Sequence, residues 1–171
     1  TVICAVAPRK LSDTPIKADA IFTNNPRVTL LMRFADCVPI LVYDPLRKVV
    51  GIIHAGWQGT VKQIAKRSIE TIIDQYGCNP GDIHAVIGPS IGQDHYEVGG
   101  DVFDKAVGVF GRDDHILIKQ DNGRKAFDLQ KANDETHQAW NANAAFWDER
   151  MGEGNDFVEV LQWPPILRLL E

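Results

Sequence analysis

The chain has 171 residues, of which 44% are hydrophobic and 24% are charged. This length and composition fit a globular domain and exclude a collagen-like or intrinsically disordered chain. The formal net charge of −5, without any Lys/Arg-rich stripe, argues against nucleic acid as a partner, and the longest apolar run is too interrupted to span a membrane.

The first half of the chain predicts closely spaced strands. Val28–Phe34 is apolar and β-branched enough for a strand, and Pro39–Tyr43 is a second, closed by the turn-forming pair Asp44-Pro45. Val49–His54 is a third strand. Because this last run is nearly all apolar, we expect it to be buried on both faces of a sheet.

A helix follows the third strand. Thr60 and Gln63 have the spacing of a capping box, which predicts that the helix begins at Thr60. Gly77 is expected to end it. The apolar residues that recur at helical spacing are Val61, Ile64, Ala65, Ile69, Ile72, Ile73 and Tyr76.

The second half alternates between strands and helices. Ile83–Ile87 and Ile116–Lys119 are predicted strands, and Asp101 is expected to cap a short helix between them. A polar helix from about Leu129 to Trp147 and a last strand at Phe157–Gln162 complete the prediction. The inward residues of the short helix would be Val102, Phe103, Ala106, Val107 and Phe110.

The domain organisation and the compartment are predicted from the absence of a linker, a repeat, a disulfide framework and a signal peptide in the sequence. No linker or repeat divides the predicted elements, so we expect one domain over residues 1–171. The chain has three cysteines, an odd number without the spacing of a disulfide framework, and it does not open with a signal peptide. These features predict a reducing compartment, the cytoplasm.

The sharpest chemical feature is the pair Cys37 and His54. Cys37 comes just after one predicted strand, and His54 ends another strand ahead of a Gly-rich turn. Thiolate and imidazole together favour zinc or copper, and a catalytic zinc needs about three protein ligands and one open position. Two other interpretations stay open: a Cys–His nucleophilic pair, or a buried cysteine and a hydrogen-bonded core histidine.

Other residues near this pair carry weaker signals. Asp36 could orient a ligand or accept a proton, or it could simply serve a turn. Trp57 could stack on a planar substrate or pack in the core. Gly88, Ser90 and Gly92 lie in a turn whose backbone N–H groups could bind an anion. The residues with no convergent spacing are Cys4, Cys78, His84, His115 and His137.

Four motifs in order resemble the YfiH/YlmD-type laccase-domain family. They are Ala35–Leu41 (ADCVPIL), His54–Trp57 (HAGW), Gly88–Gly92 (GPSIG) and Tyr96–Val98 (YEV), within a similarity that covers Asn24–Asn133. The resemblance implies that Cys37 and His54 bind a metal, usually described as zinc. It also implies an α+β fold in which layered mixed β-sheets are flanked by helices.

The sequence departs from the family pattern at three places. The family's remaining metal-binding histidine lies in an upstream Gln-Val-His-Gly motif that this sequence does not contain, so we expect the chain to lack the family's N-terminal segment. The family often has a basic residue after the tryptophan, where this chain has Gln58. From about residue 134 the tail is atypical, without the family's Cys-rich closing segment. One metal ligand and an anion-binding arginine are therefore expected to be missing.

The resemblance implies two different activities. One is a purine nucleoside phosphorylase with adenosine deaminase and methylthioadenosine phosphorylase activity, acting on a purine nucleoside and phosphate with zinc. The other is a copper-dependent polyphenol oxidase (laccase), acting on phenols and oxygen. A full laccase copper set needs on the order of ten histidines, and this chain has five. The first activity is therefore favoured, and a non-catalytic metal-binding module is the third hypothesis.

The hypothetical mechanism distributes roles among the residues of the motifs. Cys37 and His54 would hold the metal together with a third histidine, and Asp36 would orient a group or transfer a proton. Trp57 and the turn with Gly88, Ser90 and Gly92 would shape the nucleoside and phosphate pockets. A metal at such a site lowers the pKa of a bound water to roughly 7, which suits hydrolytic deamination.

Overall fold

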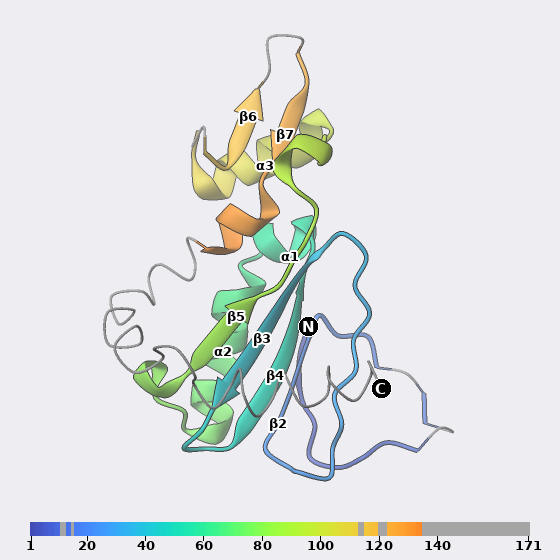
Figure 1. The fold of residues 1–171 in the computed structure, drawn as a ribbon, viewed down its shortest axis with the longest axis vertical. Coiled ribbons are helices and arrows are strands. Elements are labelled where there is room, and N and C mark those ends of the chain that lie inside the picture. The colour runs from blue at the N-terminus through green and yellow to red at the C-terminus, as the bar shows by residue number, and fades with distance from the viewer. Residues whose placement is uncertain (11–12, 15, 113–114, 120–122, 135–171) are drawn as a thin grey trace, which may run out of the picture. The chain divides into compact units, whose positions relative to one another are not determined.

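The computed structural model describes residues 1–10, 13–14, 16–112, 115–119 and 123–134, and all of them belong to one compact unit (Figure 1). The strands are β1 Val2–Cys4, β2 Ala20–Thr23, β3 Val38–Asp44, β4 Val49–Ala55, β5 His84–Ile87, β6 Leu117–Lys119 and β7 Lys125–Phe127. The helices are α1 Trp57–Val61, α2 Ile64–Tyr76 and α3 Gly100–Phe110, with short 3₁₀ turns η1 Pro80–Asp82 and η2 Gln93–His95.

A mixed five-stranded sheet in the order β1-β2-β4-β3-β5 forms the centre of the unit. β1 pairs with β2 in parallel, and the other neighbours are antiparallel. β6 and β7 form a second, two-stranded sheet. The α+β class and the mixed sheets expected from the resemblance are confirmed.

One face of the five-stranded sheet forms the core. On it lie alternate residues of the long strands, such as Ile40 and Val42 of β3 and Ile53 of β4, all at most 4% exposed. The amphipathic helix α2 packs against β1, β2 and β4. Gly51 is required by a close approach, because a Cβ there would stand 2.1 Å from the ring of Phe22.

Most of the predicted strands are present, with two corrections. β3, β4, β5 and β6 coincide with predicted runs, but Val28–Phe34 forms no strand. The inner strands β2, β3 and β4 are each paired on both sides within the sheet. The ring of Phe34 packs against the ring of His54. Burial of β4 on both faces is also wrong, since Val50 is 41% exposed. β1, β2 and β7 are further strands that the sequence did not indicate.

The predicted capping box is wrong as well. Gly56 precedes α1, and Thr60 lies buried inside that helix, where its Oγ1 accepts a hydrogen bond of 2.9 Å from Nδ2 of Asn133. Gln63, with a left-handed φ of 54°, separates α1 from α2. The end of α2 at Gly77 is confirmed by the left-handed φ of 65° at that residue.

The predicted helix after Asp101 is present as α3, and its five expected inward residues are the less exposed ones. Asp101 does not cap it, because the N-cap position belongs to Gly99 and Asp101 lies in the first turn. No helix among the described residues is long and apolar enough to cross a membrane.

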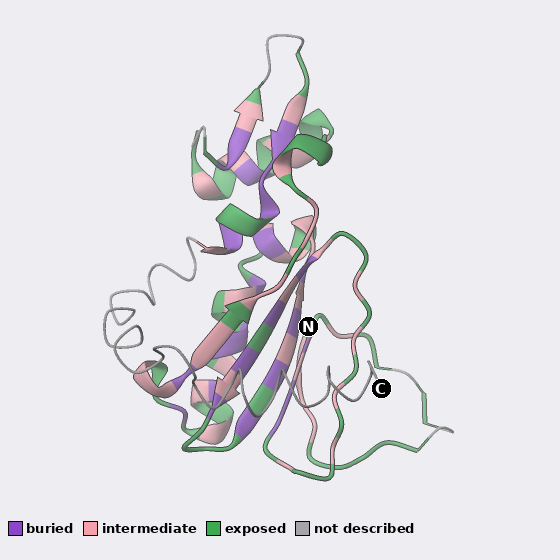
Figure 2. Ribbon diagram, in the orientation of Figure 1, coloured by how far each residue is buried: buried purple, intermediate pink, exposed green. Residues whose placement is uncertain are grey.

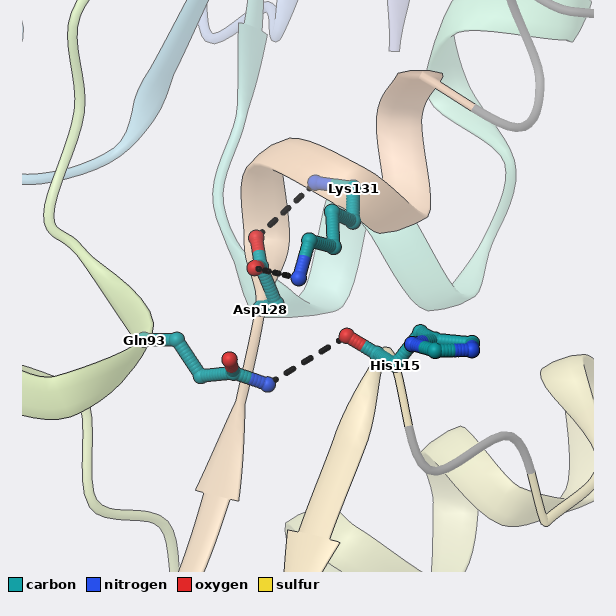
Figure 3. A network of polar contacts seen from close by, with 4 residues as sticks. All are labelled: Gln93, His115, Asp128 and Lys131. Atoms are coloured by element: carbon teal, nitrogen blue, oxygen red, sulfur yellow. Dashed lines mark hydrogen bonds and ion pairs between the residues drawn. The ribbon is translucent and has the colours of Figure 1, made fainter.

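A polar network joins the small sheet to its surroundings (Figure 3). Nε2 of Gln93 donates to the backbone carbonyl of His115 at 3.3 Å. Oδ1 of Asp128 accepts from the backbone N–H of Lys131 at 2.9 Å and caps the helical residues 129–134. The remainder of the helix predicted to about Trp147, and the strand predicted at Phe157–Gln162, lie outside the described residues.

Candidate functional site

Cys37 and His54 lie at the same edge of the five-stranded sheet. Cys37 directly precedes β3, and His54 is the penultimate residue of β4. Because the two strands are antiparallel neighbours with Pro39 opposite His54, the start of β3 and the end of β4 meet. Residues separated by sixteen others in the sequence are thereby brought together.

Gly56 marks the point where the two side chains converge. A Cβ at this position would meet Sγ of Cys37 at 3.0 Å and Cε1 of His54 at 3.5 Å. Sγ and Cε1 can therefore be no further apart than the sum of these two distances. A side chain at Gly56 would have to displace the thiol, so the glycine keeps this space open in front of α1.

The electrostatic setting of Cys37 favours the neutral thiol. Burial, followed by the neighbouring charge of Asp36, raises the pKa of Cys37. Burial, followed by the charge of Cys37, raises the pKa of Tyr96, whose side chain shares this environment. A metal bound here would have to displace the thiol proton, so its affinity would increase with pH.

The thiolate and imidazole donors fit a zinc or copper ion by their chemistry. Over the described ranges, however, no group of three His, Cys, Asp or Glu side chains is arranged to hold a metal.

Asp36 connects the site to the turn after β5. Its backbone adopts a left-handed φ of 69°, and its carbonyl accepts the N–H of Ile91 at 2.9 Å. Its carboxylate side is exposed. Gly88 lies against β3, since its N–H donates to the carbonyl of Pro39 at 2.8 Å and a Cβ would stand 2.8 Å from Cγ of Pro39.

Ser90 carries an unusual hydroxyl within this turn. Its Oγ is buried and has no hydrogen-bond partner among the described residues. Leaving a buried hydroxyl without a partner costs about 1–3 kcal/mol, so a water or ligand atom is the expected partner. Gly92 borders open space, because a Cβ there would meet nothing within 4 Å.

Trp57 begins α1 and is half-buried. Nζ of Lys105, from α3, lies 5.4 Å from the centroid of a Trp57 ring, within the range of a cation–π contact. Gln58, the position after the tryptophan, is exposed. A positive charge thus lies beside Trp57, although it comes from a different helix.

Three neighbours of the site were not identified from the sequence. Tyr96 lies in the fourth motif, which was an available signal. Phe34, whose ring centroid is 5.5 Å from that of His54, and Lys105 are brought near only by tertiary structure, and no local pattern marks them.

A family model described as multi-copper polyphenol oxidoreductase laccase matches residues 1–147. Purine nucleoside phosphorylase YlmD of Bacillus subtilis (strain 168) is 50% identical over 92 residues, which are 53% of this chain and 33% of that protein. A purine nucleoside phosphorylase of Deinococcus radiodurans is 40% identical over 117 residues, 68% of this chain and 45% of that protein. Adenosine deaminase RL5, from an unknown prokaryotic organism, is 39% identical over 118 residues, 67% of this chain and 44% of that protein.

Solved structures share the fold. Bacillus licheniformis YfiH superposes with a TM-score of 0.62 at 40% identity, over 67% of this chain and 43% of that one. YlmD from Geobacillus stearothermophilus superposes with a TM-score of 0.65 at 33% identity, over 72% of this chain and 46% of that one. The chain thus spans between a third and a half of the length of these relatives.

Proposed function

Because the chain belongs to the multi-copper polyphenol oxidoreductase laccase family, we propose that it contributes a metal-dependent site acting on purine nucleosides. The reactions are phosphorolysis of the glycosidic bond, including that of methylthioadenosine, and hydrolytic deamination of adenosine. The observation that supports this best is the convergence of Cys37 and His54 in front of Gly56. Relatives named purine nucleoside phosphorylase and adenosine deaminase support the substrate class.

Zinc is the metal we propose, held by the thiolate of Cys37 and the neutral imidazole of His54. When bound, it would supply Lewis-acid chemistry, which stabilises charge that develops on an attacked or departing group. The part burial of both ligands favours this, since charges interact more strongly away from bulk water. The hydrogen bond from the N–H of His54 to the carbonyl of Asp19, 2.7 Å long, holds the backbone that carries the imidazole.

The surrounding residues would bind and orient the substrate. Trp57 offers a flat aromatic surface for a purine, and Lys105 offers a positive charge beside it for phosphate. The unpartnered hydroxyl of Ser90 could donate to a phosphate or ribose oxygen. Asp36, exposed and next to Cys37, would accept a proton released when a ligand binds.

A copper-dependent phenol oxidase is the second candidate, favoured by the description of the family itself. A mononuclear copper and a trinuclear cluster require roughly ten histidines, of which this sequence supplies five. A metal-binding module without catalysis is the third candidate. It would use the same two donors, Cys37 and His54, without turnover.

The deciding experiment strips the protein of metal and restores zinc or copper separately. We expect hypoxanthine from inosine with phosphate, and ammonia from adenosine, in the zinc form. Cys37→Ala and His54→Ala should abolish both reactions, whereas His95→Ala, a change at an exposed histidine, should leave them unchanged. Phenol oxidation that appears only with stoichiometric copper, without nucleoside turnover under zinc, would support the oxidase instead. Tight zinc binding without any turnover would support the binding module.

A further inference from the structure

The imidazole of His54 lies outside the core of the sheet. Along β4 the buried residues are Val49, Gly51, Ile53 and Ala55, and His54 falls between the last two. Because side chains alternate between the two faces of a strand, His54 points away from the face that α2 covers. The packing of the core therefore does not hold this ring in one orientation.

Hydrogen bonding does not fix the ring either. The 2.7 Å bond from His54 to the carbonyl of Asp19 uses the backbone N–H, and within the described ranges neither ring nitrogen is bonded to another residue. A metal-binding histidine usually donates its second ring N–H to a carboxylate or a carbonyl, which fixes the orientation of the ring. At His54 that orientation is left to packing contacts.

The ring of Phe34 makes such a contact. Its centroid lies 5.5 Å from that of the imidazole, and the two ring planes are tilted by 42°. Aromatic pairs favour centroid separations of about 4.5–7 Å in tilted or offset arrangements. Cε1 of the same imidazole would stand 3.5 Å from a Cβ at Gly56. The imidazole that Phe34 contacts is thus the one that borders the open space in front of α1.

The backbone that carries Phe34 is anchored at both ends. The side chain of Asn25 donates to the carbonyl of Val6 at 2.9 Å, and the carbonyl of Asp36 accepts the N–H of Ile91 at 2.9 Å. Between these bonds, half-buried side chains alternate with exposed ones, so one side of the segment is turned toward the protein (Figure 2). The half-buried residues of this row are Val28, Leu30, Met32 and Phe34.

We propose that Phe34 is a positioning residue, whose ring holds the imidazole of His54 toward the space in front of Gly56. A ligand that is oriented before the metal arrives loses less freedom on binding, so this preorganisation raises the affinity. The purpose of the contact rests on the proposed function, because the imidazole is held for a metal only if His54 binds one. The effect of Phe34 on the orientation of the ring does not depend on that assignment.

Nuclear magnetic resonance of the metal-free protein tests the positioning directly. Because Cε1 of His54 faces Gly56, the wild type should show a nuclear Overhauser effect between Hε1 of His54 and an Hα proton of Gly56. Phe34→Leu removes the aromatic ring and should weaken this effect at least about twofold, because the imidazole then samples other side-chain torsions. Phe34→Tyr keeps the ring and should retain the effect.

Zinc affinity, measured by competition with a chromophoric chelator, tests what the positioning is for. Phe34→Leu should weaken zinc binding about tenfold, a loss typical of removing a neighbour that orients a metal-binding histidine. Phe34→Tyr should bind zinc like the wild type. Tyr43→Leu is the matched control, because the half-buried Tyr43 ring contacts a different imidazole, that of His84, with centroids 6.2 Å apart. It should leave the zinc affinity unchanged.

Circular dichroism checks that each variant folds, and Phe34→Met, which is also aliphatic and of similar volume, replaces Phe34→Leu if that protein does not fold. An Overhauser effect that is absent from the wild type, or undiminished when the ring is removed, would overturn the proposal. A weakened effect with unchanged zinc affinity would overturn its link to the metal. A wild type that binds no zinc would contradict the proposed function, whereas the Overhauser effect would still decide whether Phe34 orients His54.

Discussion

The two ends of β3 carry the same three residue types in opposite settings. At its start lie Asp36 and Cys37, with His54 on the neighbouring strand. At its other end lies Asp44, next to Cys78. His84, on the other neighbouring strand β5, pairs with Tyr43 of β3. Each end thus combines a carboxylate, a thiol and an imidazole, yet only the first resembles a site.

The difference lies in the hydrogen-bond partners of the carboxylate and the thiol. Asp44 is fully buried, and its Oδ1 accepts the N–H groups of Leu46 and Arg47, each at 2.8 Å. Burial, then a hydrogen bond to Asp44 and the charge of Asp44, raises the pKa of Cys78 to about 12. Through these bonds Oδ1 of Asp44 holds a turn. At the first end the carboxylate side is exposed, so its groups remain available to a ligand.

The largest expected effect is on stability, at Asp44. Asp44→Ala should lower the free energy of unfolding by about 3 kcal/mol, because two part-buried N–H groups of the turn and the buried Cys78 thiol lose their acceptor. Asp36→Gly should change it by less than about 1 kcal/mol, since glycine accepts the left-handed φ at no cost. Chemical denaturation measures both variants.

Asp44→Asn serves as the control, because it keeps an acceptor oxygen and should fall between Asp44→Ala and the wild type. If Asp36→Gly were as destabilising as Asp44→Ala, both ends of β3 would be structural, and the contrast between them would be lost.

The next effect is on zinc affinity, which should distinguish the two thiols. Cys37→Ala removes a proposed ligand and should weaken zinc binding at least about 100-fold, equivalent to about 2.7 kcal/mol. Cys78→Ala should leave the zinc affinity unchanged, because the thiol of Cys78 is hydrogen-bonded to Asp44 at the other end of β3. Competition with a chromophoric chelator measures both values. Equal losses from the two substitutions would contradict a single site at Cys37.

Periodicity and family motifs predicted much of the framework. The strands around β3 and β4, the helix ending at Gly77 and the α+β class were all recognisable, because each depends on local pattern or on the order of the four motifs. The convergence of Cys37 and His54 follows from two antiparallel strands joined by a short turn, a geometry that the sequence also suggests.

The failures have tertiary causes. The capping-box pattern at Thr60 and Gln63 was overridden because α1 begins earlier, at Trp57, and Thr60 bonds to Asn133, 73 positions away. Val28–Phe34 has strand composition but pairs with no strand, and the Phe34 ring packs against the ring of His54. Lys105 reaches Trp57 only through the approach of α3 to α1, and no spacing rule encodes such an approach.

The smallest expected effect is a pH dependence at the Cys78 end. The pKa of Cys78 rises from an ordinary value of 9.0 to about 12 on folding, so above pH 9 the folded chain retains a proton that the unfolded chain releases. Stability contributed by this thiol is therefore complete below pH 9 and is lost as the pH rises toward 12. The expected slope approaches about 1.4 kcal/mol per pH unit.

Cys78→Ser isolates this contribution, because serine can keep the hydrogen bond to Asp44 but does not titrate in this range. Cys37 and Tyr96 also have raised pKa values and contribute equally to both proteins. The pKa of Tyr76 is raised first by burial and in part by the charge of Cys78, so Cys78→Ser also removes that part. Denaturation from pH 8 to pH 10.5 measures the free energy of unfolding of both proteins. The wild type should lose stability relative to Cys78→Ser as the pH rises. A difference that stays constant over this range would mean that Cys78 is not held as a neutral donor, and that the two ends of β3 differ less in chemistry than in exposure.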